Sequence, residues 1–527
     1  MFSNPRDIAM MSCTCTWMRD SPVIDRVVKR KLDKHVRGCV DSETMTSLQP
    51  MANESGVMVL EFLHRATQAK KLGSRLGLGS FHSAIVGQRH TNDPSPSPNG
   101  ETQRGVEGGI PSVFTFGRGF HGQLGHGSFD DLHEPVDLKP GREDDCDVDA
   151  AGGVDMLVNR RVPVGAVGHE ADELASGTGI DAADPISVIA CGGNHTCAVT
   201  GEGKLITWGL ASSGELGHGG WTPIEISVPR LVASLRDVRV TSVSAGANHT
   251  MVVSECGGVW TCGRGRHGQL GHGHFHDSGP LQRVQALADR RLVAAAAGGT
   301  HSLVWSADGA VYSWGSNYNG QTGHGPDVAA MEPGLAWPRR IGSLRGEHVV
   351  SVAAGGHHTL VVTKSGTLYA FGRGRHGALG LGDCVDYYLP EIVDVVPMWQ
   401  ACDDSVPELR IAAVAAGINH SVILTGMGRV LTCGASNYGQ LGHGDLTPRT
   451  LFTEVEYSHD CVYGMGRNFR LVRVTAINAG DHHCAAVDDK GRVFTWGRGD
   501  WGQLGNGATR SQWSPLLMEK GMLSCLS

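Results

Sequence analysis

The chain has 527 residues, and its 53 acidic against 45 basic side chains give a net charge of −8. This balance disfavours a nucleic-acid binder that depends on overall basicity. No apolar run reaches the roughly 18 residues that a membrane helix needs, so we expect no membrane span and no membrane partner. Glycine is in excess, at 75 residues against 22 prolines, which predicts many tight turns between short strands.

The 14 cysteines are scattered and form no CxxC pair. They are typical of reduced, small apolar side chains rather than of a disulfide framework. The first residues contain no uninterrupted apolar segment of the kind found in signal peptides. We therefore expect an intracellular protein, in the cytoplasm or the nucleus.

Residues 1–71 form an extension that precedes the repeated part of the chain, and we expect it to be partly helical or disordered. A helix is predicted at about 23–36. The basic run from Lys29 to Arg37 fits the solvated face of that helix, because Ile24 and Leu32 lie on the opposite face. A nuclear import signal is the alternative interpretation of the same run.

A unit of about 50 residues repeats through the rest of the chain. In six copies a histidine is followed by a glycine 14 residues later, and by a second glycine 5 residues after that. His82 belongs to a further copy, whose hairpin carries an insertion of 21 residues before Gly117. Fixed spacing within each copy indicates a repeated supersecondary unit. The repeat residues are His82, His195, His249, His301, His358, His420 and His483, with the turn glycines Gly122, Gly214, Gly268, Gly320, Gly377, Gly439 and Gly502.

Each unit contains the pattern of four short strands. In the copy at 240–273, two extended runs are joined at Gly246, and a Gly-Gly turn at 257–258 leads to a third, as in a β-hairpin. A G-x-L-G turn follows, and then an extended segment such as 227–232. Seven G-x-L-G turns predict an all-β fold, a seven-bladed β-propeller of four-stranded antiparallel blades that protects its strand edges.

The repeat also sets the domain organisation, with one propeller at 72–522. Between the first two units, residues 141–185 hold eleven acidic side chains against three arginines and no lysine. We expect this acidic insertion to be disordered. The predicted units span 72–138, 186–232, 240–287, 293–341, 349–393, 411–456 and 474–522.

The pattern AGxxHT…GxVYTWG…GQLGHG closely resembles the repeat of the regulator of chromosome condensation family, over about 72–522. The resemblance implies a seven-bladed propeller in which the segment around Ser514 to Met518 joins blade one and closes the ring. The family includes the exchange factor for the Ran GTPase, propellers of HECT-type ubiquitin ligases and the plant UV-B photoreceptor. The photoreceptor has tryptophan directly after the turn glycine, whereas this chain has other residues there, so no UV-sensing tryptophan cluster is expected.

Three apparent motifs have simpler explanations. Four stretches match GxGxxG, but each is followed by another glycine turn and not by a helix, so no dinucleotide and no other cofactor is predicted. The repeat histidines are too dispersed to share a metal ion or a substrate, and we expect each imidazole to bond to the backbone of its own turn. His272, His274 and His276 alternate as zinc ligands can, yet we interpret them as loop residues and predict no metal site. Catalytic residues are left unassigned.

Four arginines occupy the same position of the repeat in four units, and two of these units carry another arginine two residues further on. Because equivalent positions of a propeller lie on one face, they predict a partial basic ring that docks an acidic protein surface or phosphates. Salt bridges between blades are an equally good explanation of the same residues. The candidate partner-binding residues are Arg118, Arg264, Arg266, Arg373, Arg375 and Arg498.

The function that this pattern favours is a non-enzymatic, regulatory platform that docks protein partners on one face. The alternative is a guanine-nucleotide exchange factor for a Ran-like small GTPase. In the Ran exchange factor a protruding wedge replaces one GQLG turn, whereas all seven units keep the turn here; the acidic stretch 394–410 is the candidate substitute. Chromatin is a further candidate partner, which the net charge does not support. Whether the chain has any enzymatic activity stays open.

Overall fold

The computed structural model describes residues 76–89, 110–138, 184–219, 225–329, 333–395, 410–455 and 472–518. The predicted N-terminal extension, its helix and its basic run lie outside the described residues. So does the acidic insertion, apart from its last two residues.

Within the described residues the strands form seven four-stranded antiparallel sheets, each made of strands consecutive in the sequence. Blade 1 contains β1 (Leu76–Leu78), β2 (His82–Arg89), β3 (Ile110–Gly117) and β4 (Leu132–Asp137), and blade 2 contains β5 (Ile186–Cys191), β6 (His195–Thr200), β7 (Leu205–Leu210) and β8 (Glu225–Leu231). Blade 3 contains β9 (Val240–Ala245), β10 (His249–Ser254), β11 (Val259–Gly263) and β12 (Ser278–Arg283), and blade 4 contains β13 (Leu292–Ala297), β14 (His301–Ser306), β15 (Val311–Gly315) and β16 (Leu335–Arg340). Blade 5 contains β17 (Val349–Ala354), β18 (His358–Thr363), β19 (Leu368–Gly372) and β20 (Tyr387–Ile392). Blade 6 contains β21 (Ile411–Ala416), β22 (His420–Thr425), β23 (Val430–Gly434) and β24 (Arg449–Glu454), and blade 7 contains β25 (Val474–Ala479), β26 (His483–Asp488), β27 (Val493–Gly497) and β28 (Gln512–Leu517).

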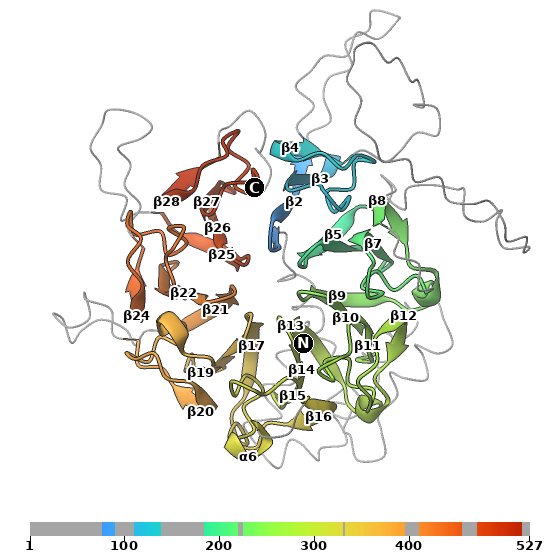
Figure 1. The fold of residues 1–527 in the computed structure, drawn as a ribbon, viewed down its shortest axis with the longest axis vertical. Coiled ribbons are helices and arrows are strands. Elements are labelled where there is room, and N and C mark those ends of the chain that lie inside the picture. Colours follow the sequence, from blue (N-terminus) through green and yellow to red (C-terminus); the bar gives the residue numbers. More distant parts are fainter. Residues whose placement is uncertain are drawn as a thin grey trace, which may run out of the picture.

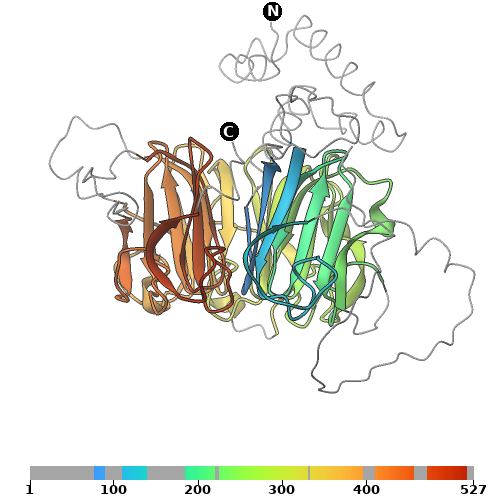
Figure 2. The ribbon, with the colours of Figure 1, turned by 90° about the horizontal axis from the view of Figure 1, so that it is seen from above.

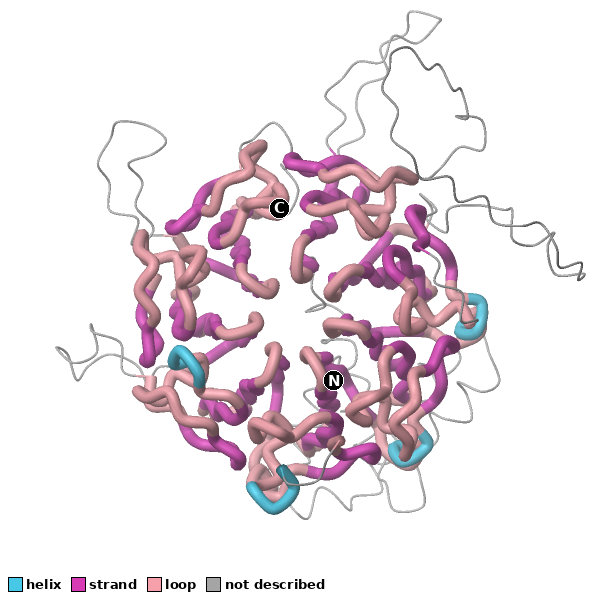
Figure 3. Tube along the Cα trace, viewed as in Figure 1, coloured by secondary structure: helices cyan, strands magenta, loops and turns pink. Residues whose placement is uncertain are grey.

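The seven sheets stand as blades around a central axis, with the first strand of each blade innermost and the fourth outermost (Figure 1). Seen from the side, the ring is a short cylinder (Figure 2). The short helical segments, among them α6 (Pro326–Ala329) and the 3-10 turns η1 (Ala233–Leu235) and η2 (Gln285–Leu287), lie near its outer edge (Figure 3). The predicted seven-bladed propeller is thus confirmed. No helix among the described residues has the length and apolar character needed to cross a bilayer.

Burial changes from the axis outward and explains the composition of the strands. The second strand of a blade is sandwiched between neighbouring blades, so β10 is buried at every residue and is rich in β-branched side chains. The fourth strand faces solvent, and β16 has no buried residue. The apolar core therefore lies between blades and not within one sheet.

Three tryptophans at the end of the third strand connect successive blades. Trp208, Trp314 and Trp496 are fully buried. Each indole Nε1 donates to a backbone carbonyl of the preceding blade, at 2.8–3.0 Å. A buried tryptophan whose N–H has a partner combines apolar burial with a satisfied polar group. These tryptophans pack in the core between blades.

The ring closes without a shared blade, which corrects the prediction for the C-terminal segment. The strand β28 pairs with β27 and completes blade 7, although the family resemblance placed it in blade 1. Blade 1 already has four strands of its own, because β1 pairs with β2 on the axial side. Blades 7 and 1 instead meet side by side, and the Asn478 side-chain amide donates to the Leu76 carbonyl at 2.6 Å.

Candidate protein-interaction face

Two turns of every blade lie at the same end of the cylinder. The A–B turn joins the first and second strands and ends at the repeat histidine, and the C–D turn joins the third and fourth strands and contains the G-x-L-G sequence. They lie together because the histidine pairs with the glycine that ends the third strand, as His82 does with Gly117 and His249 with Gly263. We call this end the A–B/C–D face. The connections between blades lie at the opposite end.

The repeat histidines link each blade to the next. The Nε2 atom of each ring lies within hydrogen-bond distance of a hydroxyl or thiol on the following blade, at 2.8–3.1 Å. The pairs are His82–Thr196, His195–Thr250, His249–Ser302, His301–Thr359, His358–Ser421, His420–Cys484 and His483–Ser83. The expected bond to the backbone of the same turn is therefore wrong. The partner is a side chain from the neighbouring blade.

The hydroxyl groups fix the tautomer of these histidines. Thr196 donates its single hydroxyl proton to the Gln123 carbonyl at 2.9 Å, so it accepts from His82, whose proton must be on Nε2. Burial lowers the pKa of His82 to about 3 and that of His195 to about 4, so both rings are neutral near pH 7. Neutral, buried and bonded rings of this kind hold blades together and offer nothing to a ligand.

The turn glycines of the G-x-L-G sequence have two reasons to be glycine. Gly122 has φ +72° and Gly268 has φ +77°, in the left-handed region that favours glycine. A methyl group on Gly122 would also lie 2.6 Å from the Cα of Ser227, on the outer strand of the next blade. The same two conditions, a positive φ and a close approach to the next blade, hold at Gly214, Gly320, Gly377, Gly439 and Gly502.

A buried side chain pins the C–D turn in six of the seven blades. The residue after the turn glycine accepts a hydrogen bond from the backbone amide two residues before it, as Gln269 does from His267 at 2.9 Å. The residues in this role are Gln123, Glu215, Gln269, Gln321, Gln440 and Gln503. Blade 5 has Ala378 at this position, which has no group able to accept the bond.

The structure places the predicted arginines on the A–B/C–D face but does not join them into one ring. Arg118, Arg264, Arg373 and Arg498 each donate a backbone N–H to a carbonyl of the A–B turn in their own blade. They belong to blades 1, 3, 5 and 7, so blades 7 and 1 are the only neighbours among them. The six candidate arginines therefore form separate groups.

Blades 7 and 1 bring two of these arginines into one cluster with aromatic rings. The Arg118 guanidinium lies 4.6 Å from the ring centre of Trp501, on blade 7, and 5.4 Å from those of Phe81 and Phe120. The Arg498 guanidinium lies 6.0 Å from the Phe81 ring centre and 4.7 Å from that of Tyr438, on blade 6. We call Phe81, Arg118, Phe120, Tyr438, Arg498 and Trp501 the seam cluster.

The contacts between blades in the seam cluster are cation–π contacts rather than the salt bridges considered as an alternative. Between described residues, the candidate arginines form ion pairs only within a blade: Arg498 with Asp500 at 2.8 Å and Arg266 with Asp277 at 3.9 Å. Sequence reasoning missed the aromatic members. For Tyr438 and Trp501 the signal was an aromatic residue directly before the turn glycine, and using it requires knowing that unit seven lies beside unit one.

The outer tips of the C–D turns expose further large side chains. Phe120 is 59% exposed and Tyr318, at the equivalent position of blade 4, is 70% exposed. In blades 3 and 5 this position holds Arg266 and Arg375. Arginine and aromatic side chains are enriched at protein interfaces, so these tips give the face the chemistry of a docking surface.

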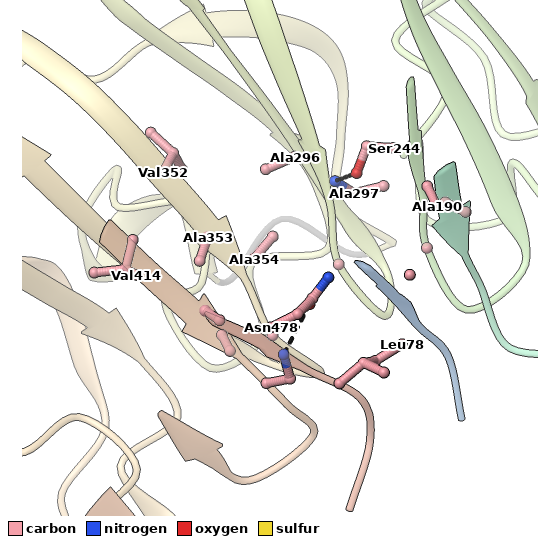
Figure 4. A pocket seen from close by; sticks show the side chains of 18 of the residues that line it. Leu78, Ala190, Ser244, Ala296, Ala297, Val352, Ala353, Ala354, Val414 and Asn478 are labelled. Carbon is pink, nitrogen blue, oxygen red and sulfur yellow. Dashed lines mark hydrogen bonds between the residues drawn. The ribbon is translucent and has the colours of Figure 1, made fainter. Parts of the chain in front are cut away.

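Two other regions, a histidine cluster and the axial cavity, are weaker candidates for a functional site. The rings of His272, His274 and His276 lie 5.5–5.7 Å apart, but His272 is bonded to Thr261, and the described residues hold no group of three or more ligands fit for a metal ion. Around the axis lies a cavity of about 1350 Å³ lined by the innermost strands. Figure 4 shows its wall of small side chains, in which Ser244 accepts from the Ala297 amide.

Comparisons with known proteins agree with this architecture. A model of the RCC1-like domain matches residues 112–524. The ultraviolet-B receptor UVR8 of Arabidopsis thaliana is 33% identical over 332 residues, covering 63% of this chain and 69% of that protein. The human E3 ubiquitin-protein ligase HERC2 is 32% identical over 343 residues, covering 63% of this chain but 6% of the ligase.

Two solved structures share the fold. Human WBSCR16 superposes with a TM-score of 0.58 at 24% identity, covering 77% of this chain and 94% of that chain. Prp20p of Saccharomyces cerevisiae superposes with a TM-score of 0.58 at 20% identity, covering 87% of this chain and 89% of that chain, and was described together with its binding to Gsp1p and histones.

Proposed function

Because this chain belongs to the RCC1-like domain family, we propose that it is a regulatory platform whose A–B/C–D face docks a protein partner. The seam cluster is the observation that carries the proposal. It combines two arginines with four aromatic side chains from three successive blades, and Phe120 is exposed at its edge. Such residues dominate the binding energy of protein interfaces.

The seam cluster is also ordered before any partner arrives. Arg118 is held by the rings of Phe81, Phe120 and Trp501, and Arg498 is held by Tyr438 and by its ion pair with Asp500. Long side chains that are already fixed lose less conformational entropy on binding. The fixed side chains therefore support a role of the seam cluster in docking a partner, rather than as ordinary surface without a binding role.

Exchange activity on a Ran-like small GTPase is the alternative function. Prp20p, which binds Gsp1p, shares the propeller fold. All seven C–D turns of this chain keep the glycine at which the wedge of the Ran exchange factor would have to emerge. We therefore favour the platform and treat exchange as an outcome to be measured.

The platform is tested by one exposed residue on each end of the cylinder. Phe120→Asp changes the seam cluster, and Met427→Asp is the matched control, because Met427 is 52% exposed in the turn between β22 and β23 at the opposite end. We expect tagged full-length wild type and Met427→Asp to recover the same proteins from cells, and Phe120→Asp to lose at least one of them. Identical recovery by both variants would contradict the proposal.

The exchange alternative needs its own measurement. Purified full-length chain is added at catalytic concentration to mant-GDP-loaded Ran, and nucleotide release is followed by fluorescence. No acceleration is expected of a platform. Acceleration that Phe120→Asp abolishes would replace the platform with an exchange factor acting through the same face.

A further inference from the structure

The C–D turns of blades 3 and 5 have the same six residues but different backbones. Both read Gly-Arg-Gly-Arg-His-Gly, at 263–268 and at 372–377. In blade 3 the His267 amide is bonded to the side chain of Gln269. In blade 5 the corresponding His376 has φ +63°, and it is the one residue other than glycine with a positive φ in the described part of the chain.

The missing pin explains the different backbone. Ala378 replaces the glutamine, so nothing holds the His376 amide in the geometry of the other blades, and the turn closes as the 3-10 segment η3 (Arg375–Gly377). A left-handed conformation is unfavourable for a residue with a Cβ atom. Strain of this kind often accompanies function, and here it falls on a turn that carries three basic side chains.

In the blade 3 turn, Arg266 has a carboxylate partner, whereas neither arginine of the blade 5 turn forms an ion pair with a described carboxylate. In blade 3, Asp277 accepts from the Gly265 amide with one oxygen and lies 3.9 Å from Arg266 with the other. In blade 5, Asp386 accepts from Gly374 with one oxygen, but its other oxygen accepts from Asn319 of blade 4 at 2.9 Å.

The second carboxylate near the blade 5 turn is engaged as well. Asp383 accepts from the Tyr387 hydroxyl at 2.8 Å and from the Val385 amide at 3.1 Å. No described carboxylate forms an ion pair with Arg373 or Arg375. Burial lowers the pKa of His376, and the positive charges of Arg375 and Arg373 lower it further.

We propose that the C–D turn of blade 5 is a binding site for an acidic peptide segment of a protein partner, whose carboxylates pair with Arg373 and Arg375. Guanidinium groups bind carboxylates in a two-pronged geometry, and the unpinned turn lets both arginines adjust to their spacing. Val385, which is 58% exposed and whose carbonyl lies against Gly374, supplies an apolar contact beside the charges. This combination suits a peptide better than a free ion. The assignment rests on the proposed use of the A–B/C–D face by a protein.

The experiment uses fluorescein-labelled hexaglutamate and the full-length chain, with binding followed by fluorescence anisotropy at low salt. We expect the Arg373→Ala/Arg375→Ala variant to bind about fivefold to tenfold more weakly than wild type, because each exposed ion pair contributes modestly. The matched control, Arg264→Ala/Arg266→Ala in blade 3, should stay within about twofold. Equal losses in both pairs, or no loss in either, would overturn the proposal.

A second variant separates turn conformation from charge. Ala378→Gln adds the missing pin and alters no charged group, so we expect hexaglutamate to bind about threefold more weakly while the chain stays folded. Unchanged affinity would show that the unpinned turn plays no part. Displacement of the peptide by inorganic phosphate at lower concentration, or tighter binding of a decathymidine oligonucleotide, would overturn the choice of a peptide. The Phe120→Asp recovery test concerns the seam cluster and not the blade 5 turn, so the proposed function can stand where this inference fails.

Discussion

Blades 3 and 5 show how one buried side chain changes a turn that the repeat otherwise keeps constant. Gln269 holds the blade 3 turn in the geometry shared by six blades, whereas Ala378 leaves the blade 5 turn to adopt a strained conformation at His376. The scaffold beneath is unchanged, because His249 and His358 bond to the next blade in the same way. A propeller can therefore vary the shape of one turn without disturbing its ring.

Acid should destabilise blades 3 and 5 alike by protonating the histidines that bond them to the next blade. This is the largest effect we expect. Burial lowers the pKa of His249 to about 3 and that of His358 to about 4, below the unfolded value near 6.5. The unfolded chain thus binds more protons, so stability is full above pH 6.5 and is lost as the pH falls toward these values.

Between pH 7 and pH 5, the buried rings of His249 and His358 should each lower the unfolding free energy by about 2 kcal/mol, measured by urea denaturation. The His249→Gln variant keeps a donor at a similar position and does not titrate, so its stability should fall less steeply with pH than that of wild type. An equal slope in the two proteins would show that His249 does not carry this dependence.

Removing the pin from blade 3 should convert its turn into the blade 5 form. Gln269→Ala deletes a buried hydrogen bond, so we expect a loss of about 1–2 kcal/mol in unfolding free energy. The His267 amide should also exchange faster with deuterium. Unaltered exchange at His267 would mean that the glutamine is not what sets the turn.

Glycine substitutions in the two turns should change the free energy of unfolding in opposite directions. His376→Gly relieves a positive φ and should stabilise the chain by about 1 kcal/mol. His267→Gly, at a residue without a positive φ, should destabilise it by several tenths to 1 kcal/mol, because glycine gains more entropy on unfolding. Thermal denaturation of the two variants side by side is sufficient, and shifts of the same sign would contradict the comparison.

The smallest effect concerns the pin that blade 5 lacks. In Ala378→Gln the new amide can accept from the His376 backbone, for a gain of up to about 1 kcal/mol. Slower amide exchange at His376 would check that the bond forms. A loss of stability would indicate that the turn cannot return to the common geometry.

Periodicity predicted the blades because their spacing is a local property of the chain. The pairing of His82 with Gly117 across a long hairpin followed from it. The contacts between blades did not follow. The hydroxyl or thiol that accepts from each histidine directly follows a repeat histidine of the next blade in the sequence, yet recognising it requires knowing which blades touch.

The candidate site was predicted only in part, for the same reason. The arginines repeat and were visible, whereas Phe81 and Trp501 lie about 420 residues apart in the sequence and come together around Arg118 only because the ring closes. The closing strand was misassigned because the family resemblance outweighed a short stretch, Leu76–Leu78, that completes blade 1. The effect of Ala378 became visible only in the positive φ of His376, because the sequence alone does not show that the equivalent glutamine holds the turn.

Because β1 and β28 each complete their own sheet, the first and last described strands belong to two complete blades, 1 and 7. The junction of blades 7 and 1 uses the histidine-to-hydroxyl link found at five of the other six junctions, and the sixth has a thiol in place of the hydroxyl. Among the described blades, the histidine link does not distinguish this junction from the others. A circularly permuted chain that starts at Val240 would therefore retain every blade intact, and the gain or loss of whole blades by gene duplication would need no new kind of closure.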